Sequence, residues 1–375
     1  MVTAVKDFLK VYWPFVLIAV LGVIVTLMLM DPAPPKHIKF AAGAQGGAYY
    51  AFAERYQRLL DEQGIEVELI ETAGSVENLR LLDEGQVDVA LVQGGLAKPG
   101  DASTLRSLGG LFHEPFWVFV REEAGVTSFG DLRSKRFAIG PLGSGTRILG
   151  VELQDEFDGT WPEASRNTLS GTAAGDALIA GQIDAAGFAA SPDAPYVQAL
   201  LRAPGISLLA FERSEALSRR QPALAAVTLL RGVVDVGADI PARDVPLVAP
   251  VAQLVVRKSL HPAIEALLVD SANAIHQDGS ILAPAGAFPD PNWTDLPVSR
   301  QAERYYENGP SFLRRYFSFD VANFLDRAWI LAIPLLTLMF PLVRVAPPIY
   351  RWRVRRKIYI WYKDLRDLEA RGRAM

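Results

Sequence analysis

The sequence of 375 residues predicts an α/β protein with two similar lobes and an apolar segment near each end. Strand-like and helix-like patterns alternate along the central part of the chain, which is typical of parallel sheets covered by helices. A motif that joins a strand to a glycine-rich loop occurs twice, at widely separated positions. Each end of the chain also holds a long run of apolar residues.

The first apolar run covers residues 11–30 and contains no charged residue. A helix of this length spans roughly 30 Å, which is the thickness of the hydrocarbon layer of a membrane. The run is longer than the core of a signal peptide, so we expect an uncleaved membrane anchor. The second run, residues 328–350, contains Pro334 and Pro341. We expect it to span the membrane too, and the alternative is a buried or interfacial hairpin.

Charge predicts the orientation of these two segments. After Val343 the chain carries ten Lys or Arg residues against three acidic ones, and such basic flanks stay in the cytoplasm. We therefore expect a cytoplasmic N-terminus (1–10), a basic cytoplasmic tail (351–375), two spans in the inner membrane and a periplasmic part between them. The total charge of −4 leaves −12 for this outer part once the ends (+1 and +7) are removed. An acidic domain without cysteine argues against nucleic acid, disulfides and thiolate metal sites.

The outer part begins after a proline-rich spacer at 31–35. Apolar residues recur at helical spacing after the first glycine-rich loop, and apolar and acidic residues then alternate as in a half-buried strand. Ser75 is placed to cap a following helix. In chain order, the expected strand, loop, helix, strand, helix and strand lie at 38–42, 43–47, 48–62, 65–69, 75–85 and 87–92.

Two pairs of matching segments indicate an internal repeat. KFAAGAQGG at 39–47 and RFAIGPLGS at 136–144 share one pattern at an offset of 97 residues. GQVDVA at 85–90 and GQIDAA at 181–186 match at an offset of 96. Two separate matches at nearly the same offset predict two lobes that each open with a strand, a glycine-rich loop and a helix. Asp88 and Asp184 would begin equivalent strands, where we expect them to hydrogen-bond a turn.

After the second lobe, the chain is expected to return to the first. The expected strand, helix and extended stretch in this part lie at 247–257, 261–276 and 289–312. We therefore assign 36–121 and 250–312 to the first lobe and 122–249 to the second. The two crossings are expected near 121–125 and 246–250.

Each glycine-rich loop leads into the N-terminus of a helix, where free backbone N–H groups and the helix dipole favour an anion. The second loop lacks the lysine of a Walker loop, neither loop has the dinucleotide fingerprint, and Ser144 lacks the flanking glycines of a nucleophile elbow. The four histidines follow no metal-ligand spacing. We therefore expect a binding protein, not an enzyme, without metal or cofactor, whose lobes close on a small carboxylate.

Four segments in order resemble the TAXI-type solute receptors of TRAP transporters: AAGAQGGAYYAFAERY, ETAGSVENLRLLDEGQVDVALVQ, LGGLFHEPFWVFVR and IGPLGSGTR. The resemblance covers roughly residues 36–280. It implies the two-lobed type II periplasmic binding protein fold, a ligand such as glutamate, glutamine or a dicarboxylate like 2-oxoglutarate, and sodium-coupled uptake through a separate permease. Two places depart from the family pattern: Ala73, where glycine is common, and 236–238, where an aromatic–proline–glycine segment is usual.

Carried over by motif, the resemblance places eleven residues at the ligand: Gly43, Gly47, Tyr50, Thr72, Gly74, Ser75, Asn78, Gln93, Ser144, Gly145 and Thr146. Tyr50 is preferred to Tyr49, which falls on the apolar face of its helix. Ser144 and Thr146 are expected to donate through their hydroxyls, and the Gly145 and Thr146 amides to point into the cleft. Arg147 is a further candidate, which faces either the ligand or solvent.

Receptors of this family are usually soluble or lipid-anchored, whereas two terminal spans would hold this chain beside one fixed membrane partner. We expect a membrane-tethered receptor that binds a small amino acid or dicarboxylate and delivers it to a TRAP-type permease. The alternative is a membrane-anchored sensor or assembly subunit that uses the same binding fold.

Overall fold

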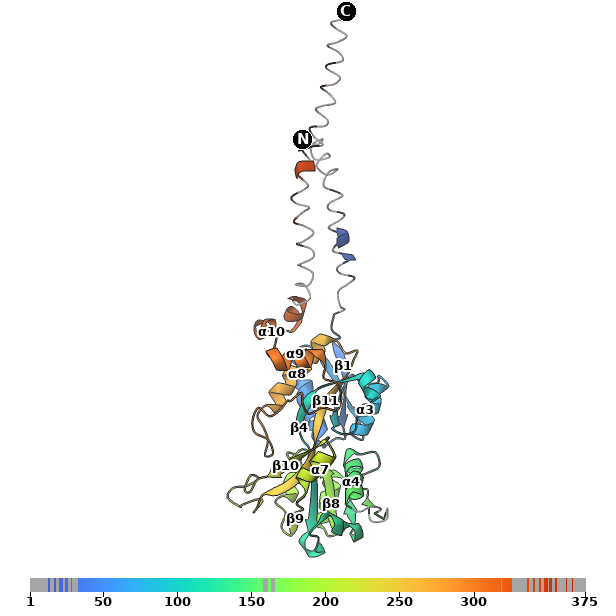
Figure 1. Ribbon diagram of the computed structural model, residues 1–375, viewed down its shortest axis with the longest axis vertical. Coiled ribbons are helices and arrows are strands. Elements are labelled where there is room, and N and C mark those ends of the chain that lie inside the picture. The colour runs from blue at the N-terminus through green and yellow to red at the C-terminus, as the bar shows by residue number, and fades with distance from the viewer. Residues whose placement is uncertain are drawn as a thin grey trace, which may run out of the picture. The chain divides into compact units, whose positions relative to one another are not determined.

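The computed structural model describes residues 33–157, 161–162, 166–317 and 319–325, together with single residues of the terminal segments. Pro34–Ser311 form one compact unit, and the two terminal segments form another (Figure 1). The expected spans 11–30 and 328–350 and the tails 1–10 and 351–375 lie wholly or mostly outside the described residues. Within the part that is described, no helix is both long and apolar enough to cross a membrane.

The compact unit contains two sheets. The first has the strand order β10-β11-β3-β1-β2, with β4 also paired to β11. Its strands are β1 (His37–Gly43), β2 (Glu66–Glu71), β3 (Val89–Gln93), β4 (Leu105–His113), β10 (Leu224–Leu229) and β11 (Val245–Arg257). The second sheet has the order β7-β6-β8-β5-β9. Its strands are β5 (Phe116–Arg121), β6 (Phe137–Ala138), β7 (Arg166–Asn167), β8 (Ala185–Ala189) and β9 (Ile206–Leu208).

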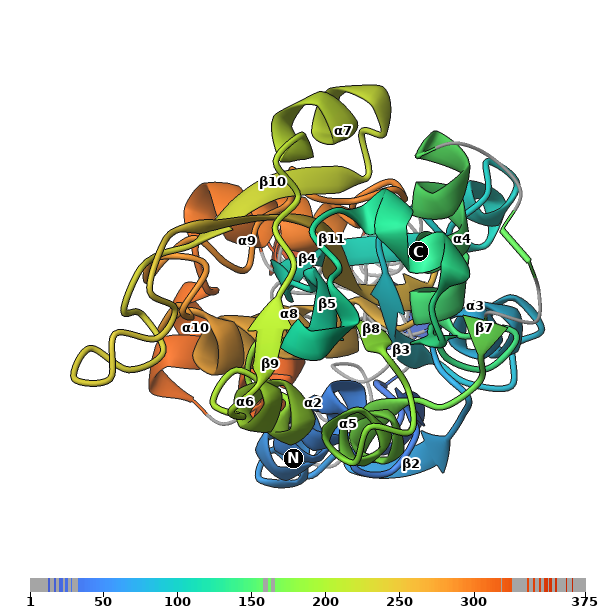
Figure 2. The same cartoon turned by 90° about the horizontal axis from the view of Figure 1, so that it is seen from below.

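Helices cover both sheets. Those of the compact unit are α2 (Ala48–Asp61), α3 (Ser75–Asp83), α4 (Gly145–Glu156), α5 (Gly171–Ile179), α6 (Pro195–Leu200), α7 (Ser214–Arg220), α8 (Pro262–His276) and α9 (Arg300–Asn308), with short 3-10 turns at Asp101–Ser103, Glu122–Ala124 and Phe129–Ser134. Helix α10 (Phe312–Tyr316) belongs to the other unit. Figure 2 shows α4 on one face of the second sheet and α5 and α6 on the other.

The two lobes repeat one another, as the sequence predicts. In each sheet the three parallel strands stand in the order second, first, third, and an antiparallel strand follows the third. The register is also the same, with paired residues Phe40–Val89 and Ala41–Ala90 in one lobe and Phe137–Ala185 and Ala138–Ala186 in the other.

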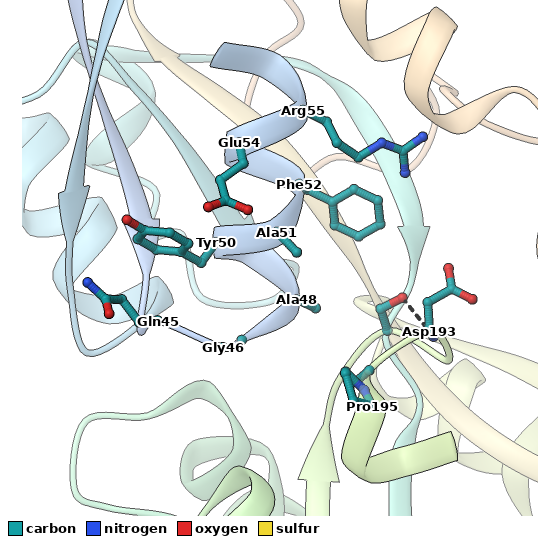
Figure 3. A pocket seen from close by; sticks show the side chains of 13 residues that line it. Gln45, Gly46, Ala48, Tyr50, Ala51, Phe52, Glu54, Arg55, Asp193 and Pro195 are labelled. Carbon is teal, nitrogen blue, oxygen red and sulfur yellow. Dashed lines mark hydrogen bonds between the residues drawn. The ribbon is translucent and has the colours of Figure 1, made fainter. Parts of the chain in front are cut away.

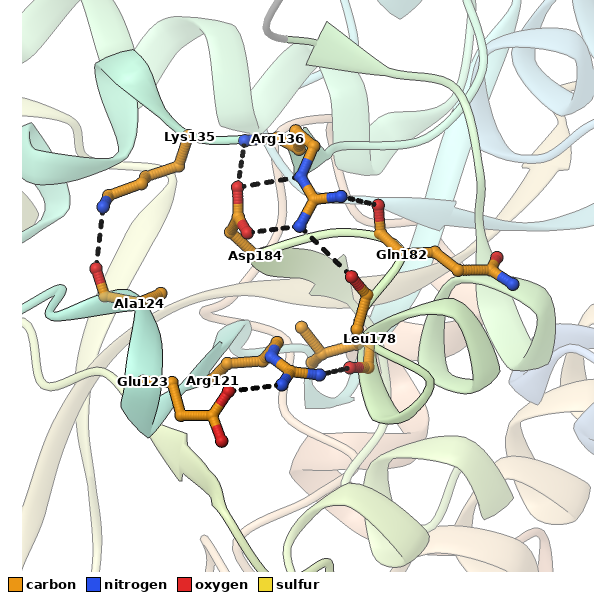
Figure 4. Close-up of polar contacts among 9 residues, drawn as sticks. Arg121, Glu123, Ala124, Lys135, Arg136, Leu178, Gln182 and Asp184 are labelled. Atoms are coloured by element: carbon orange, nitrogen blue, oxygen red, sulfur yellow. Dashed lines mark hydrogen bonds and ion pairs between the residues drawn. The ribbon is translucent and has the colours of Figure 1, made fainter.

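The two aspartates of the repeat make the same contact. Asp88 Oδ2 accepts the backbone N–H of Lys39 at 2.9 Å. Asp184 Oδ2 accepts the backbone N–H of Arg136, also at 2.9 Å, and the Arg136 guanidinium adds further bonds (Figure 4). Each aspartate therefore ties the start of its own strand to the first strand of its lobe, whereas a turn was the expected partner.

The chain crosses between the lobes earlier than expected. Strand β4 ends at His113, and β5 begins at Phe116 and pairs with β8 of the second sheet. The first crossing therefore lies at residues 114–115, not at 121–125, because the apolar run 116–121 is buried in the second lobe. The second crossing lies within β11, which pairs with β10 up to Pro250 and with β3 and β4 beyond it.

The core of the second lobe is rich in aromatic side chains. Trp117 and Phe119 of β5 are fully buried and stack with their ring planes 8° apart. The indole N–H of Trp117 donates to the carbonyl of Ala190 at 2.9 Å, so its one polar group is satisfied. Because β5 follows the first crossing directly, this core fixes the second lobe close to the point where the two lobes meet.

Candidate functional site

A cavity of about 140 Å³ lies between the lobes. Eight of the expected site residues line it, five from the first lobe and three from the second: Gly43, Gly47, Gly74, Ser75, Gln93, Ser144, Gly145 and Thr146. Tyr49, Glu114 and Tyr196 line it as well. A cavity of this size has room for several waters and suits a small ligand.

Three helix N-termini meet at this cavity. Helices α2, α3 and α4 begin at Ala48, Ser75 and Gly145, and each of these first residues lines it. Among the described residues, none accepts a hydrogen bond from the backbone N–H of Gly145 or Thr146. Free N–H groups and the positive end of the helix dipole make such a place favourable for an anion.

The hydroxyls of Ser144 and Thr146 have different tasks. Ser144 caps α4, since its Oγ accepts the backbone N–H of Arg147 at 3.2 Å, and it donates to the carbonyl of Pro141 at 2.9 Å. Its proton is therefore directed into the loop, contrary to the expectation that it serves the ligand, because a serine at this position satisfies a helix terminus. Thr146 Oγ1 accepts the N–H of Ala189 at 3.1 Å. Its proton remains available to a ligand.

Three expected site residues lie beneath the cavity and do not line it. Thr72 Oγ1 accepts the N–H of Gly43 at 3.1 Å and donates to Asn78 Oδ1 at 2.5 Å. Asn78 Nδ2 donates in turn to the carbonyl of Leu91 at 2.8 Å. Arg147 is 5% exposed, and its Nη1 donates to a loop carbonyl at 3.2 Å, so it faces neither the cavity nor solvent. These side chains support the loops.

The two tyrosines in the first turn of α2 do not lie where the sequence predicts. Tyr49 lines the cavity, whereas Tyr50 lines a larger neighbouring pocket of about 560 Å³ along α2. Figure 3 shows Asp193 and Pro195 of the second lobe on the far side of that pocket. The helical pattern places Tyr49 correctly on a buried face, but in the first turn of α2 this face meets the other lobe and not the core.

Glu114 was not expected from the sequence. It occupies the first crossing, is 3% exposed, and accepts a hydrogen bond from the Tyr49 hydroxyl at 2.7 Å. Burial raises the pKa of Glu114 to about 8. Burial and the Glu114 charge also raise the pKa of Tyr196 to about 12. An acidic residue between two strongly apolar runs, in the segment GLFHEPFWV, is the signal that could have revealed it.

The two lobes touch beside the cavity. Gln93 of the first lobe donates from Nε2 to the carbonyl of Gly145 in the second at 3.5 Å. A Cβ atom at Gly145 would overlap Gln93 Oε1 and lie 3.0 Å from Gln93 Cδ. Glycine at this position therefore permits the close approach of the two lobes.

Comparison with known proteins gives a family. A model of the NMT1-like family matches residues 40–265, which is more than half of the chain. The chain belongs to the NMT1-like family.

Solved structures are similar to this chain at low sequence identity. A protein from Bordetella bronchiseptica RB50 has a TM-score of 0.50 and 15% identity, over 75% of this chain and 100% of that one. An alkanesulfonate-binding protein from Xanthomonas axonopodis pv. citri, bound to MOPS, has a TM-score of 0.36 and 22% identity, over 48% and 62%. A histidine kinase sensor domain with similarity to periplasmic binding proteins has a TM-score of 0.42 and 15% identity, over 66% and 93%.

Proposed function

Starting from its membership of the NMT1-like family, we propose that this chain is a solute receptor that holds a small carboxylate between the two lobes of a type II periplasmic binding protein fold. The convergence of three helix N-termini on one cavity between the lobes carries the proposal. No lysine, arginine or histidine is among the described residues that line this cavity. The attraction for a carboxylate therefore comes from backbone groups of both lobes.

The N-terminus of α4 is the proposed carboxylate contact. The N–H groups of Gly145 and Thr146 and the Thr146 hydroxyl can donate to the same anion. Hydrogen bonds to a charged group contribute about 1.5–3 kcal/mol each. Because the α2 and α3 termini belong to the other lobe, a bound ligand bridges the lobes and stabilises the closed arrangement.

The finer proposal concerns delivery. The resemblance to TAXI-type receptors and the apolar runs at 11–30 and 328–350 support a receptor tethered in the periplasm that passes an amino acid or dicarboxylate to a TRAP-type permease. The basic tail 351–375 supports the second candidate, a membrane-anchored sensor or assembly subunit. Deletion of the gene for this chain separates the two, because it abolishes uptake of the ligand only if the chain serves transport.

Calorimetric titration of the full chain with glutamate, 2-oxoglutarate and succinate tests the receptor proposal. Thr146→Val should weaken binding about ten- to a hundredfold, since a donor lost from a desolvated site costs about 1–3 kcal/mol. Thr146→Ser keeps the hydroxyl and should bind as the wild type does. Thr228→Val, the same change at an exposed position of β10, is the matched control. Equal affinity of Thr146→Val and wild type would remove α4 from the site, and a wild type that binds no small carboxylate would refute the receptor.

A further inference from the structure

Glu114 is the one acidic side chain among the described residues that line the cavity, and no Lys, Arg or His is among them. One of its carboxylate oxygens, Oε2, accepts the Tyr49 hydroxyl at 2.7 Å. The other oxygen accepts a hydrogen bond from no side chain or backbone group that the structure describes. A buried carboxylate needs partners for its lone pairs, so this free oxygen is a place for a donor that the ligand supplies.

A chain of hydrogen bonds fixes the polarity of this end of the cavity. The backbone N–H of Gln93, which can only donate, bonds Ser75 Oγ at 3.0 Å. Ser75 then donates to the Tyr49 hydroxyl at 3.3 Å, and Tyr49 donates to Glu114. Every proton in the chain is directed toward Glu114, so this side chain ends the chain as an acceptor.

The cavity thus offers two kinds of electrostatic environment. Helix N-termini from both lobes favour negative charge, whereas Glu114 favours positive charge. A ligand with two carboxylates would place one of them against a buried acid, which would then have to keep its proton, because like charges repel in a medium of low dielectric. A ligand with a carboxylate and an ammonium group satisfies both environments at once.

Resting on the proposed receptor function, we propose that Glu114 determines specificity: its free carboxylate oxygen binds the ammonium group of the ligand, so the cavity takes an amino acid in preference to the corresponding dicarboxylate or keto acid.

Proton linkage gives this proposal a distinct signature. Burial raises the pKa of Glu114 to about 8, so at pH 7 the empty cavity holds it about nine-tenths protonated. An ammonium group pairs with the ionised form, so its binding must release that proton to solvent. A keto acid brings no such group and should release little or none.

The neighbouring titratable groups do not interfere. Tyr49 and Tyr196 face Glu114 from α2 and α6, and burial raises the pKa of both, that of Tyr196 to about 12. His113 precedes Glu114, packs edge-on against the ring of Phe288, and has a pKa lowered by burial to about 4. Between pH 6 and 8, Glu114 is the group of this cluster that changes charge.

The experiment compares matched ligands on the full chain: alanine with pyruvate, and glutamate with 2-oxoglutarate, which differ only at carbon 2. Titration calorimetry at pH 7 in phosphate and in Tris counts the protons released. The amino acid of one pair should bind at least tenfold more tightly than its keto acid, release about 0.9 proton, and gain about tenfold in affinity from pH 6 to pH 7.

Glu114→Gln should weaken binding of the amino acid at least tenfold, abolish the proton release, and leave the keto acid unchanged or tighter. Glu123→Gln is the matched control, since that side chain is 84% exposed and lies outside the cavity. If the wild type binds the keto acid as tightly as the amino acid, without proton release, the role of Glu114 is refuted while the receptor stands. If none of the four ligands nor succinate binds, the receptor proposal fails together with it.

Discussion

Replacing Glu114 with glutamine tests the buried carboxyl through stability alone, without any ligand. Glutamine has the same shape and still offers an oxygen to the Tyr49 hydroxyl, but it cannot ionise. Burial raises the pKa of Glu114 from 4.5 to about 8 in the folded chain, whereas the unfolded chain releases the proton near pH 4.5. The variant removes this difference and leaves the rest of the cavity in place.

The magnitude follows from proton linkage. Between pH 4.5 and 8 the folded chain holds a proton that the unfolded chain has lost, so the free energy of unfolding falls by about 1.4 kcal/mol per pH unit. Below pH 4.5 both states are protonated and Glu114 contributes no pH dependence. Over the whole interval the loss approaches about 5 kcal/mol, which is a large fraction of the stability of an ordinary domain.

Urea denaturation of the ligand-free full-length protein at pH 5 and pH 8 measures this effect. Glu114→Gln should match the wild type within about 1 kcal/mol at pH 5 and exceed it by several kcal/mol at pH 8. Glu123→Gln should follow the wild type at both pH values, because its carboxylate is exposed. If the free energies of unfolding of wild type and Glu114→Gln changed with pH in parallel, Glu114 would be ionised at neutral pH. Ligand binding would then release no proton from it.

Three further substitutions probe the cleft, the core and the repeat. Gly145→Ala should weaken ligand binding about tenfold in calorimetry, because its Cβ displaces the Gln93 side chain. It should not lower stability, because alanine favours the helix. An equal loss of affinity in a Gln93→Ala background would refute the role of the Gln93 contact. Gly187→Ala should lower the free energy of unfolding in urea by about 1–3 kcal/mol, because its Cβ would lie 3.1 Å from the ring of Phe137; no change would mean that the ring moves freely. Asp184→Ala should lower it by about 1–3 kcal/mol at pH 7 but less at pH 3, since hydrogen bonds depress the pKa of Asp184 and that stability is lost as pH falls; a pH-independent difference would contradict this.

The repeat could be predicted because short, local segments of the sequence determine it. A strand, a glycine-rich loop and a helix N-terminus each have a short-range signature, and the same signature occurs twice. Asp88 and Asp184 bond the backbone at the start of the first strand of their own lobe. Neither the repeated strand–loop–helix unit nor the backbone bond of its aspartate depends on how the two lobes meet.

The first crossing could not be placed, because pairing between distant strands decides it. Residues 116–121 form an apolar run, and an apolar run shows burial without showing which sheet it joins. The partner of β5 is β8, about seventy residues away in the chain. The same limitation hid Tyr49 and Glu114, since both act on a surface that exists only where one lobe faces the other.

Several residues of the loop motifs support the loops instead of contacting the cavity. Ser144 caps α4, Arg147 bonds a loop carbonyl, and Thr72 and Asn78 join the first loop to the sheet below it. These side chains give the loops their shape, while the groups that the loops present to the cavity are largely backbone N–H groups.

Affinity and specificity in the proposed receptor therefore have separate sources. Backbone N–H groups at the helix N-termini attract any carboxylate, because the dipole does not depend on side-chain identity. Glu114 lies outside both loops, at the crossing between the lobes. In the proposal it selects ligands that carry an ammonium group in addition to the carboxylate. Substitution of Glu114 alone should change the preferred ligand from one that carries an ammonium group to one that carries a second carboxylate. The sequences of both loops would stay the same. When receptors of this architecture are compared, the residue type at the crossing should therefore correlate with the class of ligand better than the sequence of the glycine-rich motif does.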